Sequence, residues 1–134
     1  EILSSLVKQI RPAALIVVDA LASKSVERLG KTIQISNTGI SPGSGVQNKR
    51  KEISPASMGV PVIAIGVPTV VDMATIAQEL SVDGAAVSEQ GKNMMVTPRE
   101  IDLMIEKSAK TLSLAINQAL QPMLALEDIT ALMS

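Results

Sequence analysis

Apolar residues at helical spacing mark both ends of the chain. Residues 2–10 place apolar side chains three and four positions apart, which predicts an amphipathic helix. Residues 97–120 predict the longest helix, with Thr97 as N-cap, Pro98 as the first helical residue and Glu100 completing a capping box. Shorter helical patterns cover residues 23–29, 69–80 and 126–133.

Runs of consecutive apolar residues predict the strands. Residues 14–19 run through aliphatic side chains into a carboxylate, which indicates a central strand buried on both faces with Asp19 at its carboxyl end. Residues 60–67 predict a second buried strand, and the alternation of residues 31–36 predicts a half-exposed edge strand, antiparallel to the rest. We therefore expect a single α/β domain over residues 1–134, part of a three-layer α/β/α sandwich with a mostly parallel twisted sheet.

A long connection separates the predicted strands over residues 31–36 and 60–67. Residues 37–54 carry three glycines and a proline, and connections of this length are usually functional or disordered. We interpret Gly43, Ser44 and Gly45 as shaping a substrate groove. The basic cluster of Lys49, Arg50 and Lys51 could contact an acidic substrate or remain a solvated loop. Residues 81–93 predict a second polar loop.

The composition narrows the possible chemistry. The chain has 134 residues, a net charge of −1, and no aromatic residue, cysteine or histidine. Without histidine and cysteine there is no serine–histidine triad, no thiol nucleophile and no thiolate or imidazole metal site, so we expect no metal and no cofactor. The charge indicates no direct nucleic-acid partner, and no apolar run is long enough to predict a membrane span. The missing aromatic residues and the start at Glu1 suggest an intracellular fragment of a longer chain.

Two carboxylates follow predicted strands. Asp19 either takes part in acid–base chemistry or caps a helix or pairs with a nearby cation, and its position alone leaves both interpretations open. Asp72 fits a capping box that begins at Thr69, although it would form a dyad with Asp19 if both carboxylates faced one crevice. Two close carboxylates share a proton and activate water, because like charges at short range cannot both ionise.

Several stretches together resemble the bacterial spore germination proteases. They are residues 17–28, which contain Val17-Val18-Asp19-Ala20-Leu21-Ala22-Ser23, residues 32–46, which contain Gly39-Ile40-Ser41-Pro42-Gly43-Ser44-Gly45, and residues 59–72, with further similarity at 48–52 and 95–102. In these stretches Asp19 matches one of the two aspartates considered catalytic in the family. The other aspartate belongs to an amino-terminal segment without a counterpart here, so the resemblance implies that this chain is a carboxy-terminal part and inactive alone.

The resemblance implies an endopeptidase that degrades small acid-soluble spore proteins during germination by aspartate-assisted attack of water. It also implies the phosphorylase/hydrolase-like sandwich of the hydrogenase maturation endopeptidases, a zymogen stage, a homotetramer and a place in the cytoplasm of the spore core. Members of the family often have His in place of Ser41 and a longer insertion between the helices after Asp72 and Thr97. A metal-dependent maturation peptidase and a non-catalytic oligomerisation domain are the alternatives.

Overall fold

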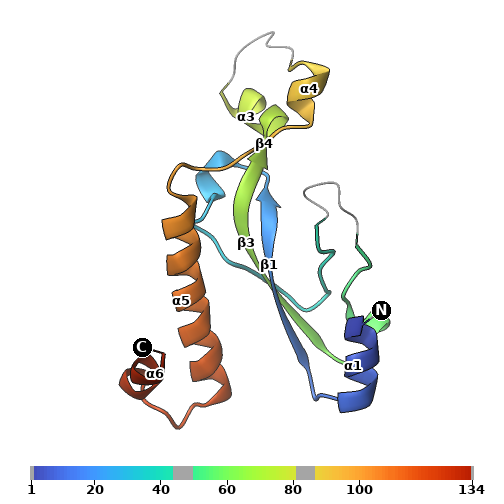
Figure 1. Ribbon diagram of the computed structural model, residues 1–134, viewed down its shortest axis with the longest axis vertical. Coiled ribbons are helices and arrows are strands. Elements are labelled where there is room, and N and C mark those ends of the chain that lie inside the picture. Colours follow the sequence, from blue (N-terminus) through green and yellow to red (C-terminus); the bar gives the residue numbers. More distant parts are fainter. Residues whose placement is uncertain (1, 44–49, 81–86, 134) are drawn as a thin grey trace. The chain divides into compact units, whose positions relative to one another are not determined.

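One mixed sheet organises the amino-terminal part of the chain (Figure 1). Strand β1 (Leu15–Ser23) runs parallel to β3 (Val62–Asp72), which is the central strand of the described sheet. On the other edge of β3, β2 (Gln34–Ser36) and β4 (Met95–Val96) both pair antiparallel to it. The α/β class is confirmed, whereas the expected central position of β1 is wrong, because β1 lies at the edge of the described strands.

The computed structural model describes residues 2–43, 50–80 and 87–133. They form two compact units, Glu1–Pro98 and Arg99–Ser134. The sheet lies in the first unit, and the two carboxy-terminal helices form the second. The expectation of a single domain over the whole chain stays a prediction.

Strand β1 is longer and less buried than its sequence predicts. It continues past Asp19 to Ser23, because Leu21, Ala22 and Ser23 go on pairing with β3. Asp19 therefore lies in the middle of the strand. Ile16 and Val18 point to an exposed face, so the prediction of burial on both faces is wrong for the described structure. An apolar run alone does not say what covers each face.

Strand β3 passes through a proline without ending. Pro68 has no N–H to donate, and the pairing with β1 shifts by one residue there, since Leu21 pairs with Pro68 but Ala22 pairs with Val70. This bulge accommodates Pro68, which cannot donate a hydrogen bond to β1, and β3 continues to Asp72. The predicted helix start at Thr69 is therefore wrong, and α3 covers only Met73–Glu79.

The core of the first unit lies at the amino end of the two parallel strands. Helix α1 (Ile2–Ile10), as predicted, brings Val7 onto Val62, and the short helix α2 (Pro55–Met58) adds Met58. Leu15, Val17 and Ile53 complete the cluster. The sequence did not predict α2, a four-residue helix that follows the predicted connection directly and has Ser54, the last residue of that connection, as N-cap.

The connection between β1 and β2 is less regular than predicted. In place of a helix over residues 23–29 there is a single 3₁₀ turn, η1 (Val26–Arg28). Gly30 follows with a φ of 61° and donates its N–H to the Pro68 carbonyl at 2.8 Å. The predicted edge strand over 31–36 shortens to Gln34–Ser36, although its antiparallel direction is confirmed.

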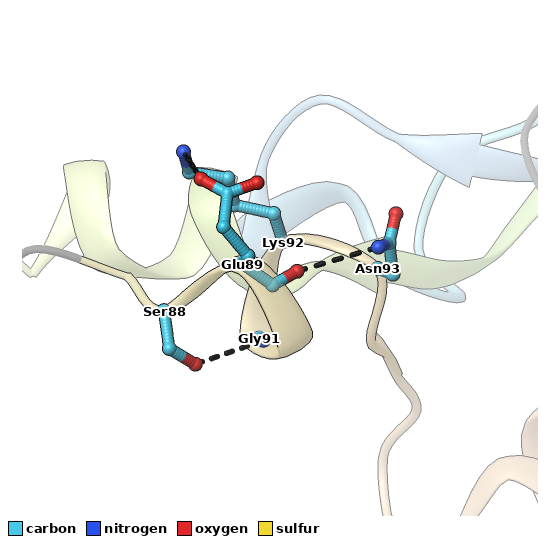
Figure 2. Close-up of polar contacts among 5 residues, drawn as sticks. All are labelled: Ser88, Glu89, Gly91, Lys92 and Asn93. Atoms are coloured by element: carbon cyan, nitrogen blue, oxygen red, sulfur yellow. Dashed lines mark hydrogen bonds and ion pairs between the residues drawn. The ribbon is translucent and has the colours of Figure 1, made fainter.

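A short helix leads the chain back to the end of β3. In α4 (Glu89–Lys92) the Ser88 hydroxyl accepts the Gly91 N–H, and the Lys92 ammonium pairs with Glu89 (Figure 2). The Asn93 side chain donates to the Glu89 carbonyl at 3.3 Å. Strand β4 follows and pairs with the end of β3. The sequence predicted neither α4, which falls within the predicted loop over 81–93, nor β4, which comes after it. Residues 81–86 of that loop lie outside the described residues.

The second unit is a helical pair. Helix α5 (Ile101–Leu120) ends where predicted but begins after Glu100, and α6 (Leu126–Leu132) packs Ile129 into the interior of the unit. Thr97 does not cap α5, because its hydroxyl donates to the Thr69 carbonyl at 2.9 Å. Among the helices that the structure describes, none has the length and apolar character needed to cross a membrane.

Candidate active site

Asp19 carries an unusual carboxylate. Its Oδ1 accepts the N–H of Ala20 at 2.9 Å. Its Oδ2 is sealed from solvent and has no hydrogen-bond partner among the described residues. A polar atom that is buried without a partner costs free energy, and most such atoms in folded proteins find a donor. An oxygen of this kind is therefore a strong marker for a missing interaction.

Three strands contribute to the row of residues that contains Asp19. Asp19 pairs with Gly66 of β3, and Gly66 pairs with Gln34 of β2, so the three residues share one face of the sheet. Gly66 has no side chain, and a Cβ there would collide with the side chain of Leu21. Gln34 and Asp19 thus flank the glycine, with their Cα atoms about 10 Å apart across two strand spacings. The sequence did not predict a role for Gln34, because its place depends on the register of β2 against β3.

Asp72 has a structural role instead. Its Oδ1 accepts the Thr75 N–H at 2.7 Å and its Oδ2 accepts the Thr75 hydroxyl at 2.9 Å, so it is the N-cap of α3. The Thr75 amide is the main cause that lowers the pKa of Asp72 below its ordinary value. Asp72 lies six positions beyond Gly66, the partner of Asp19, which is about 20 Å along the strand. The structure does not bring the two carboxylates together.

The cap makes a pH-dependent prediction. We expect Asp72→Ala to lower the free energy of unfolding by about 1 kcal/mol at pH 7, and Asp72→Asn, which keeps an acceptor, to lower it less. Because the pKa of Asp72 is lower in the folded than in the unfolded state, its charge stabilises the fold above the ordinary pKa of 3.8. That contribution is lost as the pH falls through the folded value. Urea unfolding followed by circular dichroism should show the variants converging with the wild type at low pH; a constant difference would contradict the charge effect.

The predicted groove loop is held at its base. Ile40 and Ile53 exchange both backbone hydrogen bonds, at 2.9 and 2.8 Å. Because β2 runs antiparallel to β3, this base lies toward the amino end of β3, beyond the row that contains Asp19. Gly43 has a φ of 73°, and the Arg50 N–H donates to the Pro42 carbonyl at 3.4 Å. Three candidates of this loop lie outside the described residues: Ser44, Gly45 and Lys49.

The described residues hold one kind of acid–base group at this site. In residues 2–43, 50–80 and 87–133 no three carboxylates gather in a way that could hold a metal ion. A carboxylate such as that of Asp19 can take a proton from water or share one with a second carboxylic acid. The described residues thus form an α/β protein whose sheet carries one carboxylate, Asp19, with an oxygen that has no partner among them.

Comparison with known proteins identifies the family. The model of the germination protease family matches residues 1–83, which is more than half of the chain. The chain belongs to the germination protease family, as its resemblance in sequence predicted.

Three curated relatives show the extent of the match. The germination protease of Clostridium perfringens strain SM101 is 44% identical over 160 positions, which cover 96% of this chain and 49% of that protein. The one from Caldanaerobacter subterraneus subsp. tengcongensis is 43% identical, covering 99% and 51%. The one from Bacillus velezensis strain FZB42 is 58% identical over 79 positions, covering 59% and 22%. The chain therefore spans about half the length of the first two relatives.

Proposed function

We infer that the chain is the part of a spore germination endopeptidase that supplies one of two water-activating carboxylates, Asp19. The observation that carries this proposal is the buried Oδ2 without a partner among the described residues. A buried oxygen without a donor is costly, which supports a rearrangement in the whole protein that opens Oδ2 to a second acidic group sharing its proton. The missing half of the relatives' length leaves room for that second group.

The proposed chemistry needs one of the two carboxyl groups ionised and the other protonated. The ionised carboxylate takes a proton from a water molecule as the oxygen of that water attacks the carbonyl carbon of the peptide. The protonated acid donates its proton to the carbonyl oxygen, which gives a gem-diol. The proton taken from water then passes to the amine nitrogen as the C–N bond breaks, and the second carboxylate recovers a proton from the diol as the new carboxyl group forms. Asp19 alone can perform only one of these roles, so the chain by itself is proposed to be inactive. We propose that Gln34, on the same face of the sheet across Gly66, contacts the substrate backbone.

The substrate and assembly proposals follow the family. We propose small acid-soluble spore proteins as substrates, cleaved in the spore core, by a homotetramer that is first made as a zymogen. Arg50 and Lys51 are exposed beside the predicted groove loop, which supports attraction of an acidic substrate. We propose that the second carboxylate comes from the part of the relatives' length that this chain does not span.

The full three-layer sandwich also remains a proposal. One face of the sheet is covered by α1 and α2 at its amino end. On the other face four large apolar side chains are between 36% and 71% exposed: Ile16, Val18, Ile35 and Ile63. Aliphatic side chains of neighbouring strands gathered on one face support a second layer of structure packed there in the whole protein.

The proposed activity can be tested with the full-length protein that contains this chain. Incubation with a purified small acid-soluble spore protein should give discrete fragments by mass spectrometry. We expect a chelator to leave the cleavage rate unchanged, because two carboxylates suffice for the chemistry. A full-length protein that leaves the substrate intact would contradict the proposed function. Loss of cleavage with the chelator, restored by added metal, would favour the metal-dependent alternative.

A further inference from the structure

A groove lies between α1 and α2, on the first unit. It has a volume of about 640 Å³, within the range of ligand pockets, and Val7, Met58 and Val60 form its apolar part. Lys8 and Arg11 add two positive charges to its lining, and no carboxylate belongs to that lining. The groove therefore combines an apolar floor with a cationic side.

The two charges are not neutralised by the described part of the chain. The ion pairs that form within it join Glu89 to Lys92 and Glu106 to Lys110, and neither involves the groove. Lys8 and Arg11 are both exposed. A chain with a net charge of −1 thus concentrates unpaired positive charge at this place. Such a local field favours a negatively charged ligand.

The backbone of Arg11 has an unusual conformation beside the groove. Arg11 follows the last residue of α1 with a φ of 51°, and its N–H donates to the Val7 carbonyl at 2.8 Å. Glycine is the residue that suits this left-handed position after a helix. The other residues with positive φ in the described structure are all glycines. An arginine held in this conformation is strained, and strained residues cluster at ligand-binding and active sites.

A neighbouring hollow extends the groove over an apolar surface. It has a volume of about 550 Å³, shares Gly59 and Val60 with the groove, and continues along Pro61 and Ile63. Nothing occupies the space above Gly59, where a Cβ would meet no atom within 4 Å. A chain that crosses Gly59 would meet cations on one side and apolar side chains on the other.

We propose that this groove binds an extended peptide segment that carries acidic side chains next to apolar ones. The carboxylates lie against Lys8 and Arg11, and the apolar residues lie along Pro61 and Ile63. The site is distinct from Asp19. The Leu15 N–H donates to the Pro61 carbonyl beside the groove, and Asp19 lies four residues further along β1, about 13 Å away. Peptide binding here does not depend on the proposed peptidase activity.

The test uses the full-length protein with Asp19→Asn, so that the probe is not cleaved. The probe is a fluorescein-labelled peptide of alternating Glu and Leu, and the matched neutral probe has Gln in place of Glu. We expect the acidic probe to bind more tightly by fluorescence anisotropy, and added salt to weaken it. Lys8→Gln or Arg11→Gln should each lower its affinity about threefold, and both together about tenfold, the size expected of exposed ion pairs.

Two controls separate binding from folding. Lys31→Gln removes an equal charge at an exposed position outside the groove and should leave the affinity unchanged. Arg11→Gly should raise the unfolding midpoint, since it relieves the left-handed strain, while it lowers peptide affinity. Equal binding of both probes, an equal loss with Lys31→Gln, or tighter binding of a labelled oligonucleotide than of the acidic peptide would overturn the proposal.

Discussion

Asp19→Asn in the full-length protein is expected to lower the rate of substrate cleavage by at least about a thousandfold, the scale of losing a group that transfers a proton. Asparagine keeps the shape of the side chain and an oxygen that can accept the Ala20 N–H, which Asp19 Oδ1 accepts at 2.9 Å. It cannot take a proton from water. The rate should be measured as kcat, with circular dichroism confirming that the fold is unchanged.

Asp72→Asn is the matched control for that experiment. Asp72 is also a carboxylate on a strand of the same sheet, but both of its oxygens are used by Thr75. We expect this variant to keep its kcat and to lose only a little stability. If Asp19→Asn retained wild-type cleavage, or if Asp72→Asn lost as much activity, Asp19 could not be the proton-transfer group.

The sequence predicted the long helices α1 and α5 better than it predicted the ends of the strands, for a physical reason. The sequence predicts α1 and the end of α5 because apolar residues recur at helical spacing over several turns in both segments. The end of β3 was mispredicted because a proline in a strand usually ends it, and the bulge that accommodates Pro68 depends on its pairing with β1. That pairing joins residues far apart in the sequence, so no local pattern contains it.

The candidate site was predictable only in part. The run that ends in Asp19 marks a carboxylate that local sequence does not explain, and the resemblance assigned it a role. The sequence could not show that Oδ2 would be sealed without a partner, because burial of one atom depends on packing of the whole unit. Gln34 was missed because its place opposite Gly66 depends on the register of β2 against β3. For Asp72 the capping interpretation was right and only the position was wrong, N-cap instead of third residue.

Gly39→Ala is expected to destabilise the first unit by about 3 kcal/mol or more. Gly39 has a φ of 114°, which L-residues rarely adopt. A Cβ there would lie 2.5 Å from the carbonyl oxygen of Ile53 and 2.8 Å from the Cα of Ser54. These are backbone atoms that cannot rotate away, and they belong to the bridge between Ile40 and Ile53 that closes the loop.

Gly59→Ala is the matched control, because it adds the same methyl group at a position where no backbone atom is in its way. Gly59 also has a positive φ, 75°, but a Cβ there meets no atom within 4 Å. Its cost should be the backbone strain alone, about 1 kcal/mol. Urea unfolding gives both values, and hydrogen exchange adds a local readout, since only Gly39→Ala should expose the amides of Ile40 and Ile53. If both variants lost the same stability, the close approach at Gly39 would not be what holds the base of the loop.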